Sequence, residues 1–95
     1  MDETRDLNGE WRVRRTGGLL PPLVGVRKRI RGGCGETAIG PLPGLPFDVQ
    51  GLRLRYRLPL RGLVDELEPD AAGYRGRATF RGRQLGTFEL RRGDP

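Results

Sequence analysis

The chain has 95 residues, a length that suits one hydrophobic core, and we expect a single domain over residues 1–95. Hydrophobic residues make up 35% and charged residues 32% of the chain. Seventeen arginines and one lysine against 12 acidic residues give a formal net charge of +6. The sequence has neither histidine nor serine, which excludes Ser/His/Asp and Cys/His catalytic sites and the usual zinc sites.

The ends of the chain and its apolar segments predict a cytoplasmic protein without a membrane span. No run approaches the roughly 20 apolar residues that cross a bilayer. Residues 1–10 are acidic and polar, whereas a signal peptide is basic and then apolar. The single cysteine, Cys34, lies between glycines and fits a reducing compartment. We expect residues 1–6 and 93–95 to be loose ends.

Apolar residues in the first half of the chain recur with the period of two that is typical of strands. The apolar members of the first two predicted strands are Trp11, Val13, Val24, Val26 and Ile30. Lys28 interrupts the apolar face of the second strand. Residues 16–23 could hold one helical turn, which two prolines would stop. Shorter candidate strands follow at residues 36–39 and 47–50.

The second half of the chain begins with the clearest alternation, at residues 52–61. Its predicted inward-facing members are Leu52, Leu54, Tyr56, Leu58 and Leu60. A helix would place an arginine and a proline on the apolar stripe of this segment, so we predict a strand. Further strands are predicted at residues 63–67, 74–80 and 87–90. In the segment 74–80, the shared face comprises Tyr74, Gly76, Ala78 and Phe80.

Glycine-rich and proline-rich turns separate these runs, so seven or eight short strands fill the chain. This pattern predicts an all-β, antiparallel meander. Closing the sheet removes its two free edges and buries its apolar face, and we therefore predict a small closed or nearly closed barrel. Its interior is wide enough for packed side chains or for one small ligand. The residues predicted to contact such a ligand are Trp11, Leu54, Tyr56, Tyr74 and Phe80.

The segment Gly9-Glu10-Trp11 resembles the Gly-x-Trp motif that opens the first strand of lipocalins and their relatives, the calycins. In that family the tryptophan closes the base of the barrel and an arginine from the last strand packs over its ring. The resemblance implies this role for Arg91 or Arg92, and it implies a small hydrophobic ligand in the barrel. This chain is shorter than a lipocalin and lacks its C-terminal helix. The alternative is that Trp11 is an ordinary core residue.

Acidic residues provide few candidates for chemistry. Asp65, Glu66, Glu68 and Asp70 lack the spacing of a calcium-binding EF-hand, and we interpret them as a solvated strand end and turn. We predict no metal site. Asp48 and Glu66 are candidates for a general base if either points inward, because burial raises the pKa of a carboxylate.

Arginines are predicted on the outer faces of the strands. They are Arg27, Arg29, Arg53, Arg55, Arg57, Arg75 and Arg77. The aromatic residues that would stack on bases lie on the opposite, apolar faces. We therefore expect a solvated exterior and no specific binding of nucleic acid.

Three functions remain open from the sequence. The first is calycin-like binding of a small hydrophobic or amphipathic molecule, neutral or anionic, in the barrel. The second is a small cofactor-free enzyme, such as an isomerase, cyclase or decarboxylase of a bacterial pathway, with Tyr56, Tyr74, Asp48 or Glu66 as catalytic candidates. The third is a basic surface interaction module. A homodimer is compatible with all three.

Overall fold

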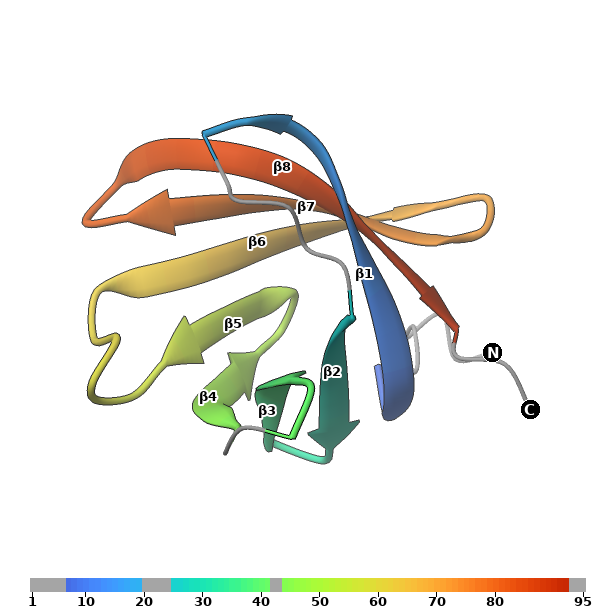
Figure 1. Ribbon diagram of the computed structural model, residues 1–95, viewed down its shortest axis with the longest axis horizontal. Helices are drawn as coiled ribbons and strands as arrows, with labels where there is room; N and C mark the ends of the chain where they lie inside the picture. Colours follow the sequence, from blue (N-terminus) through green and yellow to red (C-terminus); the bar gives the residue numbers. More distant parts are fainter. Residues whose placement is uncertain (1–6, 20–24, 42–43, 93–95) are drawn as a thin grey trace.

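The computed structural model describes residues 7–19, 25–41 and 44–92, which form eight antiparallel strands and no helix (Figure 1). Each strand pairs with the next one in the sequence, and β8 pairs with β1, so that the sheet closes into a barrel. This confirms the predicted all-β meander and its closure. The strands are β1 (Gly9–Gly18), β2 (Val26–Arg31), β3 (Cys34–Ile39), β4 (Leu45–Gln50), β5 (Arg53–Tyr56), β6 (Leu63–Asp70), β7 (Gly73–Phe80) and β8 (Arg83–Arg92).

A few predictions fall on the remaining residues. The predicted loose ends at 1–6 and 93–95, and Val24, lie outside the described residues. So do residues 20–23 of the possible helical turn. Residues 16–18 of that segment continue β1.

Strand β1 closes the barrel because it pairs on both sides. Its first residues, Gly9–Arg12, pair with β2, and Trp11–Gly18 pair with β8. The register against β8 shifts between Arg15 and Gly17. Figure 1 shows β1 leaving β2 and continuing along β8.

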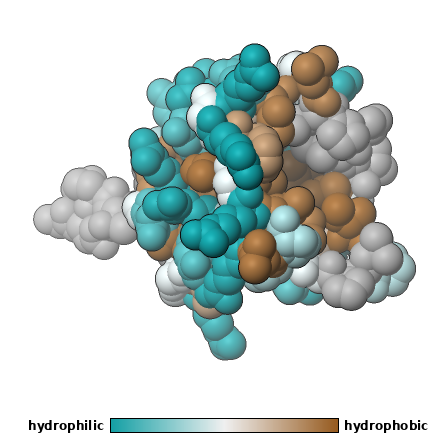
Figure 2. Space-filling model, turned by 90° about the vertical axis from the view of Figure 1, so that its left-hand side faces the viewer, coloured by the Kyte–Doolittle hydropathy of each residue, from teal (hydrophilic) through white to brown (hydrophobic). Residues whose placement is uncertain are grey.

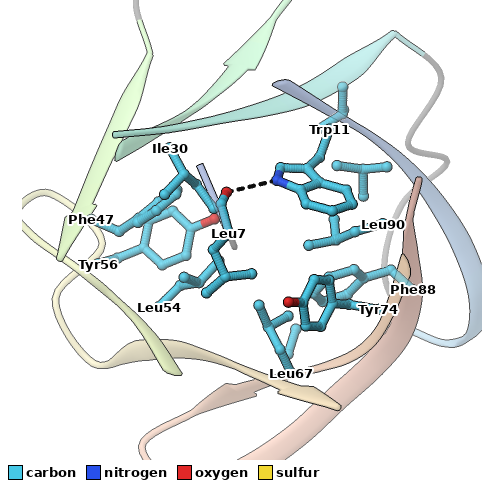
Figure 3. Packing of buried hydrophobic residues seen from close by; sticks show 13 residues of the cluster. Leu7, Trp11, Ile30, Phe47, Leu54, Tyr56, Leu67, Tyr74, Phe88 and Leu90 are labelled. Atoms are coloured by element: carbon cyan, nitrogen blue, oxygen red, sulfur yellow. Dashed lines mark hydrogen bonds between the residues drawn. The ribbon is translucent and has the colours of Figure 1, made fainter. Parts of the chain in front are cut away.

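The alternating apolar residues fill the interior in one cluster (Figure 3). Its members are Leu7, Trp11, Val13, Val26, Ile30, Phe47, Leu54, Tyr56, Leu67, Tyr74, Ala78, Phe88 and Leu90. Two aromatic pairs pack edge to face, with ring centroids 5.4 Å apart for Trp11 and Tyr74 and 5.3 Å apart for Phe47 and Tyr56. Such contacts stabilise a core beyond the area that they bury.

Two inward-facing glycines make room for aromatic rings from the neighbouring strands. Gly35 of β3 pairs with Phe47, and Gly76 of β7 pairs with Phe88. A Cβ atom at either glycine would overlap the ring of its partner. An aromatic ring lying over a glycine covers backbone that would otherwise lack a packing partner.

Three residues predicted to face the interior are exposed. Strand β5 ends at Tyr56, and the chain then turns, with a hydrogen bond from the Leu60 amide to the Arg57 carbonyl. Leu58 lies in this turn and is 71% exposed. Leu52 lies in the turn before β5 and is also exposed. Phe80 is 41% exposed because the register of β7 against β8 shifts after Ala78, so that Thr79 is buried and Phe80 faces outward.

Candidate functional site

The two ends of the barrel are different in character. We call the mouth the end at which β1, β3, β5 and β7 finish and β2, β4, β6 and β8 begin. The opposite end, where β1 begins and β8 finishes, we call the closed end.

Trp11 and Arg92 cover the closed end. The Trp11 indole Nε1 donates a hydrogen bond of 2.9 Å to the Leu7 carbonyl (Figure 3). The Arg92 guanidinium lies 4.0 Å from the centroid of the Trp11 ring and donates to the Asn8 carbonyl. Gly9 has a φ of 119°, and a side chain there would collide with Arg92. Of the two arginines predicted for this position, Arg92 therefore contacts the indole.

Arg91 faces the other way. Its Nη2 lies 3.2 Å from the Asp70 carboxylate and 3.5 Å from Glu89. Adjacent strand residues point to opposite faces of a sheet, so only one of the two arginines can cover the tryptophan.

Four polar side chains meet inside the barrel, and we call them the polar cluster: Lys28, Thr37, Tyr56 and Asp65. The Lys28 Nζ donates to the Thr37 hydroxyl at 2.8 Å and to the Tyr56 hydroxyl at 2.6 Å, and it lies 3.0 Å from Asp65 Oδ2. Tyr56 donates to the same Asp65 oxygen at 3.1 Å. All four residues are buried, and none of their buried polar atoms lacks a partner.

The polar cluster lies at one level, just below the mouth. Lys28 and Asp65 are the third residues of β2 and β6, Thr37 is two residues from the end of β3, and Tyr56 is the last residue of β5. Two residues of a strand span about 7 Å, so Lys28, Thr37 and Asp65 lie about that far along their strands from the mouth. The Lys28 ammonium also lies 5.3 to 5.6 Å from the ring centroids of Phe47, Tyr56 and Phe88.

The surroundings keep the lysine charged and the tyrosine neutral. Burial alone lowers the pKa of Lys28, but the Asp65 carboxylate and the Tyr56 hydroxyl outweigh it, and the net shift is upward from 10.5. Burial raises the pKa of Tyr56 above 10.0, although Lys28 opposes the shift. The polar cluster thus offers a fixed cation and hydrogen-bonding hydroxyls, and no free amine that could act as a nucleophile.

Only Tyr56 of the polar cluster was predicted as a site residue, and sequence reasoning missed Lys28, Thr37 and Asp65. Lys28 was predicted only as an interruption of an apolar face, and Asp65 as part of a solvated strand end. Both occupy inward positions of their strands, Lys28 between Val26 and Ile30 and Asp65 between Leu63 and Leu67. A charged residue of each sign at inward positions was the available signal for a buried ion pair.

The two carboxylates predicted as general bases lie on the outside. Asp48 pairs with Arg57, and Glu66 with Arg77. The hydrogen bonds from these arginines lower the pKa of both carboxylates, which makes them weaker bases. Because Asp65 points inward and Glu66 outward, the acidic residues of β6 do not converge on one point.

Apolar side chains surround the mouth, and we call the exposed ones the apolar rim. The rim consists of Leu19, Ile39, Leu58 and Phe80, which are 41% to 88% exposed. Half-buried leucines pack below it against the core: Leu45, Leu60, Leu63 and Leu85. The rim is continuous with this layer, since Phe80 pairs with Leu63 and the Leu19 amide donates to the Leu85 carbonyl. Figure 2 shows apolar residues gathered over one half of a face of the molecule and hydrophilic residues over the other.

The residues predicted to contact a ligand are distributed along the barrel. Tyr56 belongs to the polar cluster, and Phe80 to the apolar rim. Leu54 is fully buried in the core, while Trp11 and Tyr74 pack together near the closed end. The structure therefore places four of these five residues in the one core cluster and Phe80 outside it.

The predicted outer arginines are exposed, and most pair with acidic residues. Within the described residues, ion pairs at 4.0 Å or less join Arg14 and Glu89, Arg27 and Glu10, Arg29 and Glu36, Arg53 and Glu66, Arg57 and Asp48, Arg75 and Glu68, and Arg77 and Glu66. A surface hollow of about 970 Å³ against β5–β8 is lined by several of these pairs. The charges of this wall are largely balanced by one another. The single cysteine, Cys34, is exposed at the start of β3.

Comparison with known proteins gives no relative. No protein-family model matches the chain, and no curated protein or solved structure matches it either. Within the described residues, the structure has no helix with the length and apolarity needed to cross a membrane.

Proposed function

We propose that this protein is a calycin-like binding module that takes a small amphipathic molecule at the mouth of its barrel. The polar cluster forms the floor of this site and the apolar rim its entrance. The closed end supports the calycin assignment, because Gly9, Trp11 and Arg92 have the contacts that the Gly-x-Trp resemblance implies.

The observation that carries the proposal is the buried ion pair between Lys28 and Asp65. Both side chains are at most 5% exposed and lie within a largely apolar barrel interior. Apolar residues of similar volume are often at least as stabilising as a buried ion pair, because two charges must be desolvated. A role in recognition therefore accounts for the pair better than a role in stability.

The layers of the mouth indicate the chemistry of the ligand. The apolar body of the ligand would displace the half-buried leucines or lie against them, and it would contact the apolar rim. A hydroxyl or carbonyl group at its inner end would exchange hydrogen bonds with Tyr56 and Thr37. An anionic group would be favoured by the exposed arginines around the mouth, since charge-assisted hydrogen bonds are about twice as strong as neutral ones.

Titration with a matched pair of amphiphiles tests the proposal. Dodecanoate and dodecanol have the same chain length and differ in charge. We expect saturable binding of both, tighter binding of dodecanoate, and a rise of the melting temperature that grows with ligand concentration. The double variant Lys28→Met/Asp65→Leu replaces the ion pair with apolar residues and should weaken binding while the protein stays folded.

A control at the other end of the barrel separates the mouth from general surface binding. Leu52→Ser changes an exposed leucine of the β4–β5 turn and should leave both affinities unchanged. If neither amphiphile raises the melting temperature or saturates, the interior is a packed core and the proposal fails.

A second candidate is a cofactor-free enzyme, and the same cluster favours it. Lys28 and Tyr56 could stabilise a developing oxyanion, with Asp65 as the adjacent base. The expected signature is turnover that Tyr56→Phe abolishes while ligand affinity stays within a few fold. Binding without turnover supports the first candidate.

A further inference from the structure

Three arginines at the mouth have no acidic partner among the described residues, whereas Arg57, directly after β5, pairs with Asp48. Arg61, Arg81 and Arg83 are exposed, and none of them forms an ion pair with a residue that the structure describes. The described residues of the connections at this end, namely 19, 25, 40–41, 44, 57–62 and 81–82, include no aspartate or glutamate. The mouth therefore concentrates uncompensated positive charge.

The same end presents the apolar rim. Leu58 is 71% and Leu19 is 88% exposed, and they come from different connections. Arg81 lies over the exposed ring of Phe80, 5.5 Å from its centroid. Single exposed apolar residues are ordinary, but four around one opening, flanked by unpaired cations, form a joint apolar and basic surface.

We propose that the mouth docks on the surface of an anionic phospholipid bilayer. Peripheral binding to such surfaces combines apolar side chains at the level of the headgroups with basic residues that contact anionic lipids. A bilayer fits this surface better than nucleic acid does, because three of the four rim residues are aliphatic and offer no stacking platform for bases, and Arg81 already lies over the ring of the fourth, Phe80. The mouth is also a better docking surface than the barrel wall, where most of the predicted outer arginines are already paired with acidic residues.

Docking in this orientation would place the proposed binding site against the bilayer, where amphipathic molecules partition. The inference does not depend on ligand binding, however. Lys28→Met/Asp65→Leu should weaken the binding of both amphiphiles and leave docking intact, so the two proposals can fail separately.

Co-sedimentation with lipid vesicles tests the docking. We expect the full chain to bind vesicles of phosphatidylglycerol and phosphatidylcholine, and to bind pure phosphatidylcholine at least tenfold more weakly. Each arginine near an anionic surface is worth about a fivefold change in partitioning. Arg61→Gln/Arg81→Gln/Arg83→Gln should therefore lower binding about a hundredfold, and Leu58→Asp at least about tenfold.

Matched variants on other parts of the barrel serve as controls. Arg31→Gln/Arg53→Gln/Arg75→Gln makes the same change in net charge away from the mouth, and Leu52→Asp places a charge at the opposite end. Both controls should bind vesicles within a few fold of the unmodified chain. Equal losses in the mouth and control variants would show that only net charge attracts the protein, and would overturn the proposal.

Quenching by brominated lipids reports the orientation. Trp11, at the closed end, should remain unquenched, whereas Leu58→Trp should add emission that brominated lipid quenches. Absence of vesicle binding, or equal quenching of the two tryptophans, would contradict docking through the mouth. Tighter binding to a nucleic acid than to anionic vesicles would contradict it as well.

Discussion

Two side chains from opposite ends of the chain, Trp11 and Arg92, seal one end of the barrel. Trp11→Ala should lower the free energy of unfolding by about 3–5 kcal/mol, because a large aromatic residue is removed from a packed core. Arg92→Ala should lower it by about 0.5–2 kcal/mol through loss of the cation–π contact. Chemical denaturation measures both changes.

The neighbouring arginine provides the control for this contact. Arg92→Ala should shift the emission of Trp11, the single tryptophan, to longer wavelength as water reaches the indole. Arg91→Ala should leave the emission unchanged, because Arg91 pairs with Asp70 on the other face. A shift in Arg91→Ala and none in Arg92→Ala would contradict the arrangement at the closed end.

The ion pair between Lys28 and Asp65 predicts a marked difference between a single and a double substitution. Lys28→Met leaves the Asp65 carboxylate buried without its cation and should destabilise the protein by about 3–5 kcal/mol. Lys28→Met/Asp65→Leu removes both charges and should recover most of that loss. Urea denaturation of the three proteins measures the coupling. Equal destabilisation by the single and double substitutions would mean that the pair is not buried as described.

At the level of elements, period-two alternation was sufficient to predict the strands and their antiparallel order. It was not sufficient where the backbone departs from regular pairing. The alternation of residues 52–61 continues in the sequence beyond Tyr56, but the chain leaves the sheet there and exposes Leu58. In β7, one irregularity after Ala78 reverses the side of Phe80. Irregularities of this kind depend on pairing with distant strands, which local sequence does not specify.

The candidate site was harder to predict than the fold for a related reason. Tyr56 was predicted to face inward, and it does. Lys28 and Asp65 are 37 positions apart in the chain, on β2 and β6, and only closure of the barrel brings them together. Their pairing is a property of the whole sheet, so neither residue signals it alone.

The aromatic rings over glycines predict a position-specific effect within β7. Gly76→Ala should cost about 1–3 kcal/mol, because the new methyl group overlaps the Phe88 ring and the core must shift. Gly33→Ala, in the β2–β3 turn, meets no atom within 4 Å and should be neutral or slightly stabilising. Melting temperatures of the two variants give the comparison. A Gly76→Ala variant as stable as Gly33→Ala would show that Phe88 does not lie over this glycine.

For the whole molecule, the polar cluster makes stability depend on alkaline pH. The pKa values of Lys28 and Tyr56 are raised above 10.5 and 10.0 in the folded state, so the unfolded chain releases these protons first. The folded state then binds more protons, and stability falls as pH rises. Their contribution is complete below about pH 10 and is lost above it as the folded-state pKa values are passed.

Urea midpoints at about pH 9 and about pH 11 should therefore differ clearly. In Lys28→Met/Asp65→Leu/Tyr56→Phe the difference should be much smaller, since both groups with raised pKa values are gone. An equal decline in both proteins would place the alkaline sensitivity outside the polar cluster.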